Sequence, residues 1–259
     1  MASLREKVLI VTGSTGIAAA AVRRAVADGA SVLVASGDSE SAWELAAETG
    51  AQCWVGDLTL SSSADSVLSQ CLACHGRVDA LFNAAGLSGR RFGDGPVHEL
   101  GDEGWDLTLA HNLKITFLMC RAVTGRMLQQ EVGEDGVRGA IVNTGSILSE
   151  APEPVHFATH AYAAAKGAIA AMSRSMAAYY APHRIRVNAI APGLVRTPTS
   201  ERASAADLAE FVRKKQPLTD GMIEAEDAAR AALFLLSEDA RPITGELLAV
   251  DGGWHISGI

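Results

Sequence analysis

The chain has 259 residues, of which 48% are hydrophobic and 20% are charged, and its formal net charge is −8. This composition is typical of a globular protein with one sizeable core, and we predict a single domain over residues 1–259. The acidic balance argues against a nucleic-acid partner or an anionic membrane, since both attract basic side chains. The N-terminal apolar run at residues 8–11 is too short for a signal peptide or a membrane span, so we expect a cytoplasmic protein.

Apolar strand-like runs alternate with helical segments along the whole chain. Strands are predicted at residues 8–11, 31–35, 52–55, 78–82, 140–144, 185–190 and 247–250. Helices are predicted from the turn at 12–16 to about 28, and at 40–48, 61–75, 102–131, 159–180 and 225–237. The segment 86–101 is predicted to be a polar, Gly-rich loop, and 193–222 a mixture of loop and short helix. This order predicts an α/β fold with a doubly wound, mainly parallel seven-stranded sheet and helices on both faces, which binds ligands beyond the carboxyl ends of its strands.

Tyr162 and Lys166 lie four residues apart in a predicted helix, which places both side chains on one face, one turn apart. An ammonium beside a phenol favours the phenolate, so we expect Lys166 to lower the pKa of Tyr162. Such a pair can move a proton to or from a substrate oxygen. A single pair of this kind also arises by chance, so its interpretation depends on the motifs around it.

A Gly-rich turn follows the first predicted strand. Gly13 and Gly16 permit a tight turn whose backbone amides face a phosphate at the start of the next helix, and Ser14 and Thr15 add hydroxyl donors. A tight turn without a ligand remains the alternative for this motif taken alone.

Four cysteines are present, and the segment from Cys71 to His75 matches the spacing of haem-attachment and redox motifs. We reject both readings, because haem attachment belongs to exported proteins and the segment is typical of the last turn of an amphipathic helix. The seven histidines are scattered, and no cluster has the spacing of metal ligands, so we predict no metal.

Taken together, these motifs resemble the short-chain dehydrogenase/reductase family in its single-domain form of about 250 residues. The resemblance runs the whole length and rests on the segments 12–18, Asp57, 83–86, Asn112, 143–146, the Tyr162/Lys166 pair, 186–188, 192–197 and 251–253. It implies a Rossmann-type fold, a nicotinamide dinucleotide, and hydride transfer between an alcohol and a carbonyl.

The resemblance also implies a role for each residue. Tyr162 would be the general acid/base, Lys166 would hold the nicotinamide ribose, and Ser146 would stabilise charge on the substrate oxygen. Asn112 would anchor a water near Lys166, or would merely satisfy backbone groups in a helix. The implied cofactor-binding residues are Gly13, Ser14, Thr15, Gly16, Ile17, Ser36, Asp57, Leu58, Asn83, Ala84, Gly86, Tyr162, Lys166, Pro192, Gly193, Val195 and Thr197.

The chain departs from the family pattern in two places. Its Gly-rich turn is one residue shorter, and Ala18 replaces the last glycine, so the turn must be reshaped. The second strand ends in Ala35-Ser36-Gly37-Asp38, with neither the acidic residue of an NAD site nor the arginine of an NADP site at the expected position. Because no basic residue lies in the first turn, NAD is favoured weakly over NADP.

Three segments are expected to contact the substrate: about 87–98, 147–160 and 197–222. The second separates Ser146 from Tyr162 by 16 positions and indicates a small insertion, and the third is expected to be a mobile lid. A small or medium neutral alcohol or ketone is the expected substrate. Arg90 and Arg91 could meet an anion, although both are typical of a solvated surface. By resemblance, the protein is expected to form a homotetramer or a homodimer.

Three functions are compatible with these residues. The first is an NAD(P)-dependent alcohol dehydrogenase or carbonyl reductase. The second is a non-catalytic NAD(P)-binding regulatory protein, which the altered turn makes conceivable. The third is an epimerase, dehydratase or lyase that recycles its cofactor. The intact set Asn112, Ser146, Tyr162 and Lys166 favours the first.

Overall fold

The computed structural model describes residues 4–197, 200 and 206–257. Its centre is a seven-stranded sheet with the order β3-β2-β1-β4-β5-β6-β7, and every neighbouring pair is parallel. The strands are β1 (Val8–Thr12), β2 (Ser31–Ser36), β3 (Gln52–Val55), β4 (Ala80–Asn83), β5 (Gly139–Thr144), β6 (Ile185–Pro192) and β7 (Leu247–Val250). The order reverses between β1 and β4, and this switch point is where open α/β sheets bind ligands.

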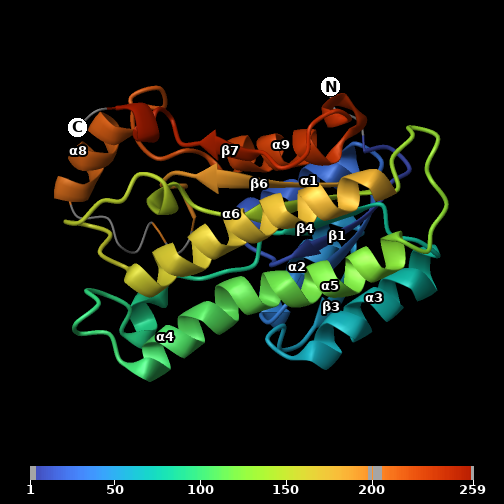
Figure 1. Ribbon diagram of the computed structural model, residues 1–259, viewed down its shortest axis with the longest axis horizontal. Helices are drawn as coiled ribbons and strands as arrows, with labels where there is room; N and C mark the ends of the chain where they lie inside the picture. Colours follow the sequence, from blue (N-terminus) through green and yellow to red (C-terminus); the bar gives the residue numbers. More distant parts are fainter. Residues whose placement is uncertain (1–3, 198–199, 201–205, 258–259) are drawn as a thin grey trace.

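Helices cover both faces of the sheet (Figure 1). One face carries α3 (Ser61–His75), α4 (Asp102–Leu109), α5 (Ile115–Met127) and α6 (His160–Tyr180), with α5 and α6 running across the front of Figure 1. The other face carries α1 (Gly16–Ala27), α2 (Ser39–Thr49) and α9 (Ala225–Leu236). The helix α8 (Ala206–Lys215) lies beyond the ends of the strands, near the C-terminus. The predicted doubly wound α/β fold is therefore confirmed.

The sequence of β1 explains its central place. All five of its residues are buried, because the strand is covered on both faces. Leu9 and Val11 point into the core beneath α1 and α9, whereas Val8 and Ile10 point into the core beneath α3 and α5. The continuous apolar run thus feeds two separate cores, one on each side of the sheet.

Two predicted elements differ from those observed. The fourth strand begins at Ala80 instead of residue 78, because the backbone N–H and C=O of Val78 pair with the side chain of Gln130 instead of a neighbouring strand. The predicted helix 102–131 ends at Met127 and contains a π-helical segment at Ala110–Lys114, which separates α4 from α5. This segment holds Asn112.

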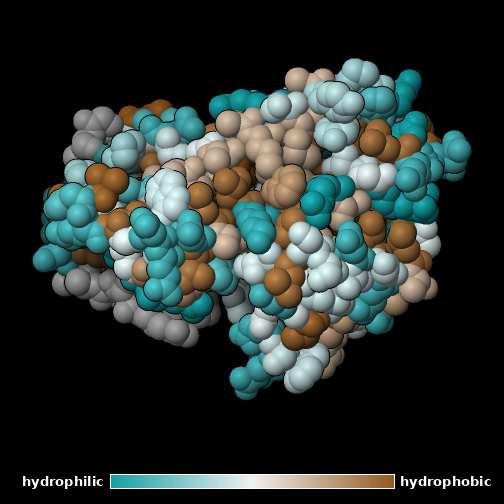
Figure 2. All heavy atoms as spheres, turned by 60° about the horizontal axis from the view of Figure 1, so that its bottom comes forward, coloured by the Kyte–Doolittle hydropathy of each residue, from teal (hydrophilic) through white to brown (hydrophobic). Residues whose placement is uncertain are grey.

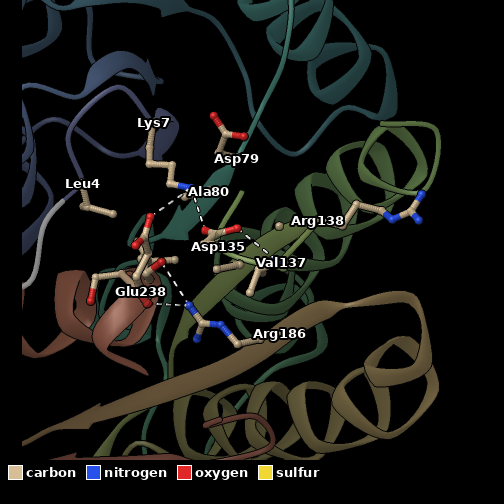
Figure 3. A pocket seen from close by; sticks show the side chains of 13 residues that line it. Leu4, Lys7, Asp79, Ala80, Asp135, Val137, Arg138, Arg186 and Glu238 are labelled. Carbon is tan, nitrogen blue, oxygen red and sulfur yellow. Dashed lines mark hydrogen bonds and ion pairs between the residues drawn. The ribbon is translucent and has the colours of Figure 1, made fainter. Parts of the chain in front are cut away.

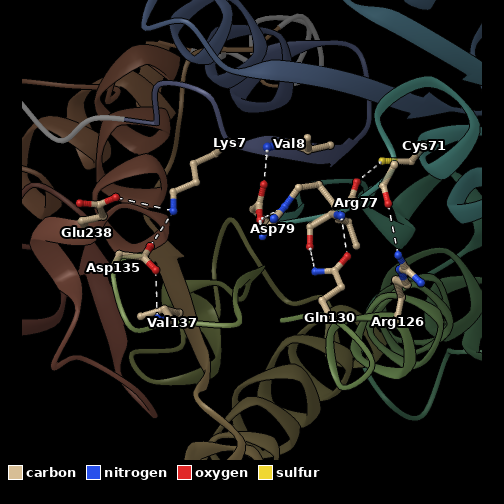
Figure 4. A network of polar contacts seen from close by, with 12 residues as sticks. Lys7, Val8, Cys71, Arg77, Asp79, Arg126, Gln130, Asp135, Val137 and Glu238 are labelled. Carbon is tan, nitrogen blue, oxygen red and sulfur yellow. Dashed lines mark hydrogen bonds and ion pairs between the residues drawn. The ribbon is translucent and has the colours of Figure 1, made fainter. Parts of the chain in front are cut away.

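Polar side chains gather at the edge of the sheet where the strands begin. Lys7 contacts Asp135 at 2.6 Å and Glu238 at 3.6 Å around a shallow hollow (Figure 3). Arg186 donates to the carbonyl oxygens of residues 235, 236, 237 and 243, and burial lowers its pKa to about 10. Nearby, the carboxylate of Asp79 accepts from the backbone N–H of Val8 (Figure 4). These contacts tie helix ends and strand starts together, on the edge opposite the candidate site.

Apolar and polar side chains are interspersed on the face shown in Figure 2. Eleven large apolar residues of the described chain are exposed, among them Trp105, Phe117 and Tyr179. No helix within the described ranges is long and apolar enough to cross a membrane.

Candidate active site

Ser146, Tyr162 and Lys166 come together at the carboxyl end of β5. Tyr162 is in the first turn of α6 and Lys166 one turn later, so both side chains lie on the helix face toward β5. The Nζ atom of Lys166 donates to the carbonyl oxygen of Thr144 at 2.9 Å and lies 5.4 Å from the centroid of the Tyr162 ring. Ser146 begins the short 3-10 helix η3 (Ile147–Ser149) and is hydrogen-bonded to Tyr162. The structure therefore groups a phenol, a hydroxyl and an ammonium.

Burial, instead of the lysine charge, controls the pKa values of this group. Desolvation raises the pKa of Tyr162, and the hydrogen bond with Ser146 opposes that rise. Desolvation also lowers the pKa of Lys166 to about 8. The expectation that Lys166 lowers the pKa of Tyr162 is therefore wrong for this structure. The physical reason is that Lys166 is bonded to Thr144 and meets the face of the phenol ring, while both groups are removed from water.

Asn112 is fully buried in the π-helical segment between α4 and α5. Its side-chain amide donates to the carbonyl oxygens of Leu87 and Thr108 and accepts from the Leu87 N–H, at 2.9–3.3 Å. A Cβ built on Gly86 would lie 2.7 Å from Asn112 Oδ1 and 3.3 Å from Lys166 Nζ. Asn112 therefore does satisfy backbone groups. Its Oδ1 and the Nζ of Lys166 also both lie close to Gly86.

The shortened Gly-rich turn keeps a shape suited to a phosphate. Gly13 and Gly16 have φ angles of +93° and +53°, which residues other than glycine rarely adopt. The helix α1 begins at Gly16. The backbone amides of Ala18 and Ala19 donate to the carbonyl oxygen of Thr15, at the start of α1. The amides of Gly16 and Ile17 come before them in the chain and point out of the helix start, as the first amides of a helix do. The methyl group of Ala18 lies 3.2 Å from the position that a Cβ on Gly13 would take. Because Gly13 has no side chain, there is room for this methyl group.

Three hydroxyl groups meet at the end of β2. The Oγ of Ser14 lies 2.8 Å from that of Ser36 and 2.7 Å from that of Ser41. Ser36 also accepts from the Asp38 N–H, and the Asp38 carboxylate caps α2. Ser14 thus joins the Gly-rich turn to the second strand through neutral side chains. Ser41 is a site neighbour that sequence reasoning missed, since it lies inside a helix with no motif around it.

Four further predicted cofactor residues follow the strands β3 and β4 or end them: Asp57, Leu58, Asn83 and Ala84. Asp57 has a lowered pKa because it accepts from the hydroxyl and the N–H of Thr59, while Leu58 is buried. Asn83 points inward and donates to Asn143 Oδ1 at 2.9 Å and to Cys120 Sγ, and its Oδ1 is buried without a partner. The side chain of Asn83 therefore braces the interior, and Ala84 packs against the apolar core.

Residues 193–197, which follow β6, pack beside the Gly-rich turn. A Cβ on Gly16 would come within 2.9 Å of Thr197, and Gly193 donates to the carbonyl of Val250. The buried side chain of Gln216 bonds the N–H and C=O of Leu194 at 2.6 and 3.1 Å. Pro192 ends β6, and Val195 is buried. Gln216 was missed by sequence reasoning, because nothing in the sequence links it to residue 194.

The expected substrate segments meet through aromatic side chains. His156 lies 4.8 Å from Phe211 of α8, and Trp254 lies 5.6 Å from Phe211 and 5.8 Å from Phe157, between ring centroids. Arg90 donates to the His156 carbonyl and faces the Phe157 ring, so it is engaged within the protein. The predicted lid 197–222 is only partly described, since residues 198–199 and 201–205 lie outside the described ranges.

The cysteines take no part in this group. Cys71 and Cys120 are buried, and burial raises the pKa of each thiol to about 12. Cys71 lies in α3, as predicted. Among the described residues, no three His, Cys, Asp or Glu side chains gather as metal ligands.

Comparisons with known proteins decide the family. A family model described as enoyl-(acyl carrier protein) reductase matches residues 11–255. The chain is 34% identical over 259 residues to 2,5-dichloro-2,5-cyclohexadiene-1,4-diol dehydrogenase from Sphingobium indicum, covering 98% of this chain and 99% of the relative. The chain is a short-chain dehydrogenase/reductase. D-threitol dehydrogenase from Mycolicibacterium smegmatis is 35% identical over 96% of this chain and 93% of its own.

Solved structures agree with the fold. A structure described as ribose-5-phosphate isomerase from Brucella melitensis 16M superposes with a TM-score of 0.88 at 32% identity, over 98% of this chain and 95% of that one. As a short-chain dehydrogenase/reductase, the protein is an oxidoreductase that acts on a CH–OH group with NAD(P). The groove lined by Ser14, Thr15 and Gly16, with amides at the start of α1, fits such a dinucleotide.

Proposed function

We propose that this enzyme interconverts a small neutral alcohol and its ketone, with Tyr162 as the general acid/base and NAD as the preferred cofactor. The observation that carries the proposal is the grouping of Ser146, Tyr162 and Lys166 beside the carboxyl end of β5. The bound dinucleotide supplies the acceptor or donor of the hydride. The rest of the chemistry falls to these side chains.

In the oxidation direction, the phenolate form of Tyr162 accepts the hydroxyl proton while a hydride leaves the carbinol carbon. In the reduction direction, the phenol donates this proton to the carbonyl oxygen. Ser146 donates a hydrogen bond to the oxygen and stabilises the charge that develops there. Lys166 has a pKa lowered to about 8, so near neutral pH it remains mainly an ammonium, and its Nζ lies 5.4 Å from the centroid of the Tyr162 ring. The carbonyl oxygen of Thr144 accepts from the Lys166 ammonium and holds it in place.

The preference for NAD is supported by the neutral end of β2. The Ser14, Ser36 and Ser41 hydroxyls offer hydrogen bonds to ribose hydroxyls, and the carboxylate of Asp38 accepts from the Ser41 N–H beside them. Arg23, which lines the neighbouring groove, is bound through two contacts to Glu48. A 2′-phosphate would meet hydroxyls and a carboxylate instead of a guanidinium.

Titration with NADH and NADPH, followed by nicotinamide fluorescence, tests the preference. We expect NADH to bind with a Kd at least about tenfold lower. In the Gly37→Arg variant we expect NADPH affinity to rise. A Cβ at Gly37 would make only an ordinary 3.7 Å contact, so the new side chain fits. Equal affinities in the unaltered protein, or a variant that fails to gain NADPH binding, would contradict the assignment.

A panel of alcohols and ketones tests the reaction class. We expect changes in NADH absorbance with at least one small neutral substrate. Binding of the cofactor without turnover of any member would favour a regulatory protein. Product formation with no net change in absorbance would favour an epimerase or lyase.

We propose further that the protein is a cytoplasmic homotetramer or homodimer. Support comes from the exposed large side chains Trp105, Phe117 and Tyr179 on α4, α5 and α6, which a second copy could cover. Light scattering after size-exclusion chromatography tests the assembly, and a monomeric mass would contradict it.

A further inference from the structure

The start of the catalytic helix α6 is held by a loop more than sixty positions earlier in the chain. The carboxylate of Asp94 accepts from the N–H of Ala161 through Oδ1 and from the N–H of Tyr162 through Oδ2, each at 2.9 Å. The carbonyl of Gly95 accepts from the N–H of His160 at 3.4 Å. Three successive amides at the helix start are thus satisfied by two adjacent loop residues.

The local sequence does not provide this cap. Thr159 occupies the N-cap position but makes no side-chain cap bond, and its hydroxyl donates to Phe157 instead. Asp94 is only 6% exposed, so its carboxylate and the amides it binds are largely removed from water. A buried carboxylate beside the start of a 21-residue helix also meets the positive end of the helix dipole. Without Asp94, two buried amides would lose their acceptors.

The same loop is also hydrogen-bonded to the π-helical segment between α4 and α5. Leu87 exchanges two hydrogen bonds with the side chain of Asn112. Between these anchors, Gly89 is enclosed by Asp94 and Thr108, since a Cβ there would fall 2.7 Å from Asp94 Cβ. Residues 87–95 therefore connect the π-helical segment to the first turn of α6. This part of the expected substrate loop binds catalytic elements of the protein itself.

We propose that Asp94 is a positioning residue, which sets the place of Tyr162 by capping the turn that carries it. The inference rests on the proposed role of Tyr162 as acid/base. The cap bonds the backbone of Tyr162 directly, so its loss lets the first turn of α6 fray and shifts the phenol relative to Ser146. A displacement of about 1 Å in a catalytic group lowers turnover by as much as about a hundredfold.

The test compares kcat with cofactor affinity in Asp94→Ala. We expect kcat to fall by about 10- to 100-fold. The NADH Kd should stay unchanged, because the Gly-rich turn is untouched. A second substitution should restore turnover: Thr159→Asp places a carboxylate at the N-cap, where it can reach the amides of residues 161 and 162. If Asp94→Ala folds poorly, Asp94→Asn, which retains one acceptor, supplies the measurement.

Asp135→Ala is the matched control, since that carboxylate also accepts a backbone N–H but lies at the opposite edge of the sheet (Figures 3 and 4). It should lose stability and keep kcat. The proposal is overturned if folded Asp94→Ala turns over like the unaltered enzyme, or if Thr159→Asp restores stability without kcat. Failure of the underlying function differs from both, because Tyr162→Phe would then remain active.

Discussion

Replacing Gly86 by alanine tests whether Asn112 and Lys166 must stay as close as the structure places them. The new methyl group would lie 2.7 Å from Asn112 Oδ1 and 3.3 Å from Lys166 Nζ. Non-bonded heavy atoms meet at roughly 3.5 Å, so Asn112 must move by about 0.8 Å. Gly86 does not have a left-handed φ, so the effect comes from this contact alone.

The cost follows from what holds Asn112. Its bond from the Leu87 N–H is already 3.3 Å long, and a further shift breaks it. One lost hydrogen bond costs about 1 kcal/mol, and forcing a methyl group into a packed site costs about 1–3 kcal/mol. We therefore expect the unfolding free energy to fall by about 2–4 kcal/mol, and kcat by up to about a hundredfold if Lys166 moves with Asn112.

Denaturant unfolding and steady-state kinetics measure both effects. Gly125→Ala is the control: Gly125 lies inside α5, and a Cβ there would meet nothing within 4 Å. It should raise the unfolding free energy by about 0.5–1 kcal/mol and leave kcat unchanged. A Gly86→Ala enzyme with unaltered stability and turnover would refute the packing argument.

Two further predictions concern buried cations. Arg186→Met should lower the unfolding free energy by about 2–4 kcal/mol, because four backbone carbonyls lose their donor. The kcat per folded molecule should be retained, since these carbonyls lie at the edge of the sheet away from Tyr162. Loss of kcat with normal stability would contradict this prediction. The pKa of Lys166 falls from 10.5 unfolded to about 8 folded, so the unfolded state holds this proton more tightly. Below pH 8 the full cost, about 3 kcal/mol, is present, and it is relieved as the pH rises from 8 to 10.5. Lys166→Met should therefore be inactive yet more stable at pH 7, with a smaller advantage at pH 9.5 in denaturant titrations; a variant less stable at both values would contradict the assignment.

The strands were predictable because each buried strand is a short apolar run with turn residues at its ends. Residues 52–55 and 247–250 match the predicted bounds, and the helix 61–75 does as well. The start of β4 was not predictable, since it depends on Gln130, which lies 52 positions from Val78. The π-helical turn was not predictable either, and it contains Asn112, whose side chain bonds Leu87, 25 positions earlier.

The candidate site divides in the same way. Ser146, Tyr162 and Lys166 were predictable from the motifs and do come together. Asp94 and Gln216 were not, because each acts through a backbone group far away in the sequence and neither belongs to a motif. The direction of the Tyr162 pKa was wrong because spacing on a helix does not reveal how completely the site is buried.

The most direct test of the account is hydride transfer in Tyr162→Phe with NADH bound. The variant keeps the aromatic ring and loses the hydroxyl that bonds Ser146. The account predicts an unaltered NADH Kd and a transfer rate that falls by about 100- to 10,000-fold in a rapid-mixing experiment with a ketone substrate. Transfer at the rate of the unaltered enzyme would mean that another group supplies the proton.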